Sequence, residues 1–270
     1  MRSDHTNATP STATRKPAGK PDTGKETRHC HKAKEMAWGT FDVDDVCADT
    51  VFDGALHAAY ACSDSDPALG AHVLAFWSIA ASNTGRPADA ESMVSAALAA
   101  VRGRTTPRVE AMLYSRRARA RAHLGDNRCW HDLGRAADCL DAHSSGHDDP
   151  EWVYWFDRAE LLGVAASTHL DFGQPKLAER AFADAAALFP PDRVRTQALF
   201  LTRQADAQLR QNDLERACAT AEQALDLTAE ISSHRSIGPL RELSAKMRTH
   251  DTVPVVHDFR ERARTMLSVA

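Results

Sequence analysis

The stretch Ala165–Ala187, AASTHLDFGQPKLAERAFADAAA, predicts two antiparallel helices joined by a tight turn. Ala178, Phe182 and Ala185 follow one another at steps of four and three residues, which places them on one face of a helix. Gly173 stands where the chain must reverse, and glycine adopts the left-handed backbone conformation that ends a helix at little cost. The stretch therefore has the pattern of the centre of a helix–turn–helix unit.

The same pattern recurs along the chain at spacings of about 40 residues, which is typical of a helical repeat. The four turn residues tolerate the left-handed conformation: Gly85, Gly125, Gly173 and Asn212. Seven positions before each turn the residue is small: Ser78, Ala118, Ala166 and Ala205. Five positions after it stand Ala90, Trp130, Ala178 and Ala217, with the tryptophan as the exception. Twelve positions after it the residue is always alanine: Ala97, Ala137, Ala185 and Ala224. Stacked helix pairs require small side chains at equivalent points of closest approach, so we expect these positions to be buried.

The composition agrees with a helical fold. The chain has 270 residues, of which 43% are hydrophobic and only 6% are aromatic, and no runs of alternating β-branched residues occur. We therefore predict an all-α fold, a solenoid of antiparallel helix pairs. The repeats are expected at about 67–101, 107–143, 150–189 and 191–231.

The two ends of the chain are expected to differ from the repeats. Residues 1–38 are rich in Thr, Pro, Lys and Gly and nearly lack large apolar side chains, which predicts a disordered basic segment. Residues 39–66 are expected to hold one capping helix. Residues 232–270 are expected to form a capping helix pair, at about 237–249 and 254–268, with Pro254 starting the second helix.

The pattern of a small residue, a turn glycine and two later alanines resembles the tetratricopeptide repeat (TPR) in a divergent form, over residues 67 to about 231. This resemblance implies that the solenoid is a right-handed superhelix. A narrower resemblance is carried by PRVEAMLYSRRARARAHLGD, by DDPEWVYWFDRAELLGVAASTHLDFGQPKLAERAF and by VPVVHDFRERARTML. These segments look like the C-terminal repeat domain of actinobacterial helix-turn-helix/TPR transcriptional regulators. The resemblance implies a regulatory role, and we expect the DNA-binding domain of those proteins to be absent here.

An aromatic stripe is the first candidate site. Asp148, Asp149 and Pro150 predict a helix start, which would place Trp152, Trp155 and Phe156 on one stripe of that helix. Such a stripe either packs on the preceding repeat or lines a groove that holds an apolar peptide or ligand.

Polar residues on the first helix of each repeat form the second candidate site. The TPR resemblance implies that this helix faces a concave groove. The candidates that belong to the predicted groove are Arg119, His123, Asp171, Asp206 and Arg210. Arg119 and Arg210 could bind a ligand carboxylate, or they could form surface ion pairs. We interpret the neighbouring run of Arg116, Arg117, Arg119 and Arg121 as a solvated helix face.

No metal site and no catalytic site are expected. Cys129, His131, Cys139, His143 and His147 are spread too widely for a zinc site, so the cysteines are interpreted as reduced, buried thiols. Motifs of known enzyme classes are not found. We therefore expect a protein that is not an enzyme and that has no cofactor.

Net charge restricts the partners. Residues 1–34 carry eight basic and three acidic side chains, which leaves a charge of −9 for residues 35–270 out of the total of −4. Nucleic acid is therefore not expected to bind the repeats, and neither a membrane span nor a secretion signal is expected, so the location would be cytoplasmic.

The sequence as a whole predicts a regulatory module whose groove binds a peptide, a small molecule or a partner protein, with oligomers allowed. Two alternatives remain open. One is a truncated helix-turn-helix regulator that binds DNA, and the other is an accessory protein of a biosynthetic gene cluster.

Overall fold

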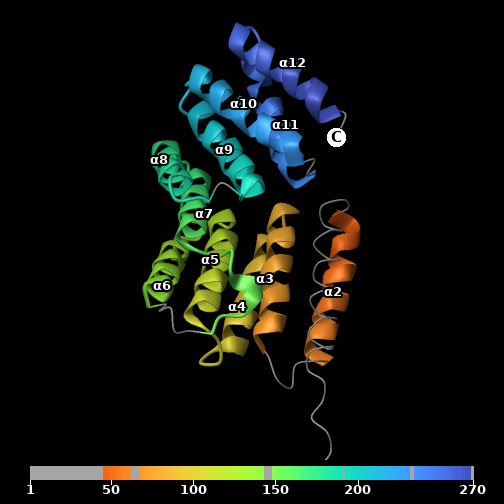
Figure 1. Cartoon of the computed structure of the whole chain (residues 1–270), viewed down its shortest axis with the longest axis vertical. Coiled ribbons are helices and arrows are strands. Elements are labelled where there is room, and N and C mark those ends of the chain that lie inside the picture. Colours follow the sequence, from red (N-terminus) through yellow and green to blue (C-terminus); the bar gives the residue numbers. More distant parts are fainter. Residues whose placement is uncertain (1–44, 62–66, 143–147, 191, 232–233, 269–270) are drawn as a thin grey trace, which may run out of the picture.

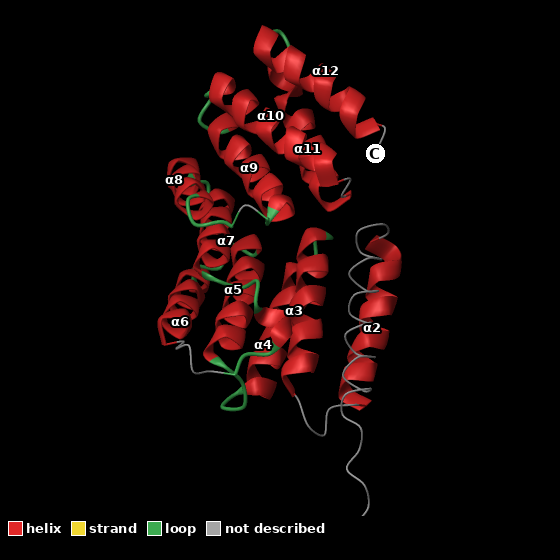
Figure 2. Ribbon diagram, viewed as in Figure 1, coloured by secondary structure: helices red, strands yellow, loops and turns green. Residues whose placement is uncertain are grey.

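The computed structural model describes residues 45–61, 67–142, 148–190, 192–231 and 234–268. All regular elements within these ranges are helices (Figure 2). They are α2 (Asp45–Ala61), α3 (Pro67–Asn83), α4 (Pro87–Val101), α5 (Pro107–His123), α6 (Arg128–Ala142), the 3₁₀ helix η1 (Glu151–Val153), α7 (Arg158–Asp171), α8 (Pro175–Ala186), α9 (Val194–Leu209), α10 (Leu214–Ile231), α11 (His234–Met247), the 3₁₀ helix η2 (Arg248–His250) and α12 (Pro254–Ser268). The segment 1–38, for which the sequence predicts disorder, lies outside the described residues. No helix in these ranges is long and apolar enough to cross a membrane.

The helices form antiparallel pairs that stack in chain order. α3 packs on α4, α5 on α6, α7 on α8 and α9 on α10, and the first helix of each pair also contacts the first helix of the next pair. The first helices α3, α5, α7, α9 and α11 thus lie side by side, and Figure 1 shows the stack as an arc from α2 to α12. The structure is a TPR-like solenoid, as the sequence predicts. We call the surface formed by α3, α5, α7, α9 and α11 the first-helix face.

The turns of the four pairs have the backbone conformation that their residues predict. Gly85, Gly125 and Gly173 have φ values of 78°, 69° and 68°, and Asn212 has a φ of 59°. This left-handed region is costly for residues with a bulkier or β-branched side chain. Because the turn depends on local backbone sterics, sequence spacing alone was sufficient to locate it.

Alanine positions confirm the predicted close approaches in three of the four pairs. Ala90 and Ala97 in α4, Ala178 and Ala185 in α8, and Ala217 and Ala224 in α10 are all fully buried. Pair α5–α6 is different. There the fully buried positions are Cys129 and Ala136, while Ala137 and Trp130 are only partly buried. The predicted register of this helix was wrong by one residue, and the shift moves Trp130 outward onto His169 and Phe172.

A second correction concerns the start of α7. The sequence predicts a helix from about residue 150, but the chain forms only the short η1 there, and α7 starts at Arg158. Asp157 caps α7, because its side chain accepts a hydrogen bond of 3.0 Å from the Glu160 backbone N–H. Trp152, Trp155 and Phe156 therefore do not form a helical stripe.

Two helical glycines should respond in opposite ways to alanine. A Cβ at Gly163 in α7 would lie 1.9 Å from the ring of Phe200 in α9, whereas a Cβ at Gly134 in α6 would meet nothing within 4 Å. Gly163→Ala should cost about 1 to 3 kcal/mol through overpacking, and Gly134→Ala should gain up to about 1 kcal/mol in helix propensity. Urea denaturation of both variants measures the difference. Equal stabilities would show that the Phe200 ring moves away freely.

Candidate functional site

Residues 148–157, which join α6 to α7, cover the part of the first-helix face formed by α3 and α5. The Trp152 ring stacks on His72 of α3 with ring centroids 3.9 Å apart. Trp155 packs edge-on against Phe76 of α3 and lies under the guanidinium of Arg116 of α5, 5.3 Å from the ring centroid. The segment therefore occupies a surface that the sequence assigned to a ligand.

This segment is a fixed part of the core. Trp152 is 7% exposed, and Val153 and Phe156 are completely buried. Burial of three such side chains contributes about 5 to 9 kcal/mol to the stability of the fold. The binding free energy of a weak ligand is too small to displace the segment. Of the three predicted aromatic site residues, Trp152 and Phe156 are thus core residues, and only Trp155 keeps part of its ring accessible.

The arginine run of α5 is not the solvated face that the sequence suggested. Arg117 and Arg121 point toward α6 and both bind the fully buried carboxylate of Asp132, at 2.7 and 2.8 Å. Arg121 also pairs with Glu91 of α4 at 2.9 Å. This ion network lies inside the solenoid, so its role is to hold α4, α5 and α6 together.

The other two arginines of the run lie on the first-helix face and contact α7. Arg116 pairs with Glu160 at 3.7 Å. Arg119 pairs with Asp171, and His123 lies 3.5 Å from the same carboxylate. Three predicted site residues, Arg119, His123 and Asp171, are thus brought together at one point.

His123 is neutral in this cluster. Arg119 donates from Nη2 to His123 Nε2 at 2.8 Å, and since a guanidinium can only donate, that ring nitrogen must be the acceptor. Burial and, second, the charge of Arg119 lower the pKa of His123 from 6.5 to about 4. The histidine therefore adds no charge to the cluster at neutral pH.

Acid should destabilise the fold through His123. The unfolded chain takes up a proton near pH 6.5, while the folded chain takes it up only near pH 4, so stability falls as the pH drops between these values. The loss is at most about 3 kcal/mol. Urea denaturation at several pH values should show a shallower loss in His123→Gln than in the unchanged protein. An identical pH dependence in both would contradict this assignment.

Arg203 of α9 is a member of this cluster that the sequence reasoning missed. Its Nη1 donates to the Ser167 hydroxyl of α7 at 2.8 Å, and no carboxylate within the described ranges forms an ion pair with it. Burial and, next, the nearby Arg119 lower its pKa to about 10. The sequence could have indicated Arg203 through its position seven residues before Arg210, because residues seven apart lie on one face of a helix.

The first-helix face continues onto α9 and α11 with a second ion group. Asp206 accepts from Arg210 at 2.9 Å and from Lys246 of α11 at 3.1 Å, both at the same carboxylate oxygen. Arg210 also donates to the Leu170 carbonyl at 3.0 Å. Asp206 and Arg210 were both predicted, while Lys246 was not.

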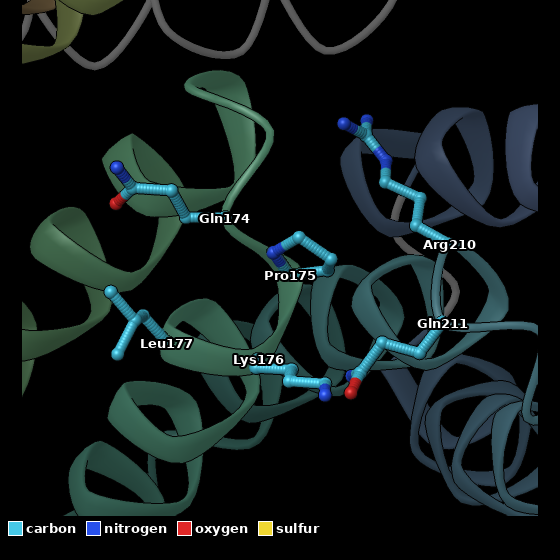
Figure 3. A pocket seen from close by; sticks show the side chains of 6 residues that line it. All are labelled: Gln174, Pro175, Lys176, Leu177, Arg210 and Gln211. Carbon is cyan, nitrogen blue, oxygen red and sulfur yellow. The ribbon is translucent and has the colours of Figure 1, made fainter.

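A pocket of about 360 Å³ lies next to this group, between the start of α8 and the end of α9 (Figure 3). Its lining residues come from the turns of two successive helix pairs: Gln174, Pro175, Lys176, Leu177, Arg210 and Gln211. Arg210 therefore borders both the first-helix face and the pocket.

The cysteines of the described part are buried thiols. Cys129, Cys139 and Cys218 form no disulfide, and burial raises the pKa of Cys129 and of Cys218 to about 11. No group of three or more His, Cys, Asp or Glu side chains within the described ranges is arranged to hold a metal ion. His143 and His147 lie outside these ranges.

Comparisons with known proteins found only distant likenesses, to solved structures. No family model matches the chain, and no curated protein matches it in sequence. Among solved structures, BtubC (BKLC) from P. vanneervenii is 13% identical, with 78% of this chain and 91% of that chain covered and a TM-score of 0.47. A putative kinesin light chain with nearly identical TPR-like repeats from Podosopora anserina is 13% identical, covering 75% and 96%, with a TM-score of 0.49. The MamA protein is 16% identical, covering 75% and 95%, with a TM-score of 0.38.

Proposed function

We propose that this protein is a non-catalytic binding module that takes an acidic segment of a partner protein on the part of the first-helix face that runs from the end of α5 to α11. The observation that carries the proposal is Arg203, a largely desolvated cation that forms no ion pair with a described carboxylate. Glu160 and Asp171 act on Arg203 only at longer range. A desolvated cation without an ion pair is costly, and an anionic ligand that binds it directly removes that cost.

The charge balance of this surface supports the choice of an acidic partner. The two ion groups contain five cations, Arg116, Arg119, Arg203, Arg210 and Lys246, and three carboxylates, Glu160, Asp171 and Asp206. Burial raises the pKa of Glu160, so protonation of that group would only increase the excess. The surface is thus positively charged, although residues 35–270 carry a net negative charge. A surface of this kind favours a partner segment of the opposite charge.

The position of the surface also suits an extended segment. Residues 148–157 close the first-helix face on the side of α3, and Trp155 forms the boundary next to Arg116. A partner segment that contacts Arg119 and Arg203 would therefore run toward Arg210 and Lys246. The biological role that we propose is regulatory, since the module would change the availability of its partner, as the resemblance to repeat domains of transcriptional regulators implies.

Selection of a random peptide library on the full chain tests this proposal. The selected peptides should be enriched in Asp and Glu, and their binding should weaken as salt is raised. Arg203→Gln should weaken binding at least about tenfold, or 1.4 kcal/mol. The matched control is Arg180→Gln, an exposed arginine of α8, which should leave binding unchanged.

Thermal unfolding of both variants checks that the fold is intact. Selected peptides without an acidic preference would overturn the proposal. So would equal binding by Arg203→Gln and Arg180→Gln.

A further inference from the structure

The pocket between the turns of pairs α7–α8 and α9–α10 exposes an apolar side chain that the packing of the helices does not require. Leu177 is 52% exposed although it is a large apolar residue, and it lines the pocket together with Pro175 (Figure 3). The volume of about 360 Å³ is at the lower end of the range for sites of small ligands. The pocket is therefore large enough for one or two amino-acid residues.

Two cations stand beside this apolar surface. Lys176 is exposed, and its ammonium forms no ion pair within the described part of the chain. Arg210 shares a single carboxylate, that of Asp206, with Lys246. None of the six lining residues is acidic, so the pocket presents positive charge next to an apolar surface.

Hydrogen bonds hold the polar side chains of the pocket in place. Gln174 Oε1 lies 2.7 Å from His169 Nδ1, which leaves the Gln174 amide nitrogen free to donate to a ligand. Gln211 Nε2 donates to Glu179 Oε2 at 2.7 Å. Arg210 is fixed by its bond to the Leu170 carbonyl. Donors that are fixed before binding lose less entropy when a ligand arrives.

We infer that this pocket binds an apolar side chain followed by a carboxylate, within a segment of a partner polypeptide. The apolar side chain contacts Pro175 and Leu177, and the carboxylate accepts from Lys176, whose side chain points toward the side of the pocket that Gln211 lines (Figure 3). A purely apolar ligand would desolvate the two cations without compensation. A long polyanion such as nucleic acid is opposed by the net charge of −9 on residues 35–270. The site lies at the turns and does not require binding at Arg203.

The dipeptide N-acetyl-Leu-Glu is a suitable probe, followed by amide chemical shifts of the full ¹⁵N-labelled chain. This dipeptide and its two comparison dipeptides carry a C-terminal amide, so that the glutamate side chain is the one carboxylate. We expect a Kd of about 1 mM with shifts concentrated at residues 174, 176, 177, 210 and 211. N-acetyl-Leu-Gln and N-acetyl-Gly-Glu, which each lack one of the two groups, should bind at least about fivefold more weakly, a loss of about 1 kcal/mol.

Variants of the chain separate this site from the first-helix face. Lys176→Ala and Leu177→Asn should each weaken dipeptide binding about fivefold or more, while Arg203→Gln should leave it unchanged. Arg102→Ala, which removes an exposed cation at the end of α4, is the control for Lys176→Ala and should leave dipeptide binding unchanged. Absence of shifts at residues 174, 176 and 177 would overturn the inference, as would equal binding of the amidated N-acetyl-Leu-Gln. Shifts confined to Arg119, Asp171 and Arg203 would also overturn it, while supporting the proposed function.

Discussion

Replacing Asp132 with asparagine is expected to lower the free energy of unfolding by about 3 to 5 kcal/mol. The Asp132 carboxylate is fully buried and accepts from two guanidinium groups, of Arg117 and Arg121. Asparagine keeps the shape of the side chain but removes its charge, so Arg117 remains largely buried without a counter-charge. Arg121 retains Glu91, so most of the loss should arise at Arg117.

Asp141→Asn in the same helix, α6, is the matched control. Asp141 pairs with Arg158 where both side chains are more than 60% exposed, and such pairs contribute at most about 1 kcal/mol. Urea denaturation of the two variants measures both losses. A loss of less than about 1 kcal/mol for Asp132→Asn would mean that Arg117 reaches solvent when its partner is neutral.

Replacing Trp152 with alanine is expected to cost about 3 to 5 kcal/mol, although the residue belongs to a connection between helices. Its indole ring is 7% exposed and stacks on the completely buried His72. Removal of the ring leaves a cavity over α3 and loosens the segment 148–157 that closes the first-helix face.

Tyr154→Ala is the control for this prediction. Tyr154 lies two residues away in the same segment but is 72% exposed, so its loss should change stability by no more than about 0.5 kcal/mol. Thermal and urea unfolding distinguish the two variants. Similarly small losses of stability in both variants would show that a ligand can displace residues 148–157. The surface of α3 and α5 would then be a candidate binding surface as well.

The candidate site was only partly accessible to sequence reasoning. Arg119, His123, Asp171, Asp206 and Arg210 could be placed on the first-helix face because the repeat fixes which side of each first helix they occupy. Arg203 and Lys246 were missed, because their importance depends on which carboxylates reach them from neighbouring helices.

The sequence by itself determined the features that depend on local backbone geometry. The left-handed turns at Gly85, Gly125, Gly173 and Asn212 and most of the alanine contacts could be read from spacing, because turn sterics and helix periodicity act within a few residues. In pair α5–α6 a shift of one residue broke this regularity.

Only the tertiary structure decided how distant side chains pair. Arg117 and Arg121 bind Asp132 inside the solenoid, while Arg116 and Arg119 of the same run lie on the opposite side of α5. Trp152 lies on His72 because the stacking of pairs brings the α6–α7 connection over α3. Such contacts join residues far apart in the chain, and their free energy depends on burial and charge that arise only when the helices stack.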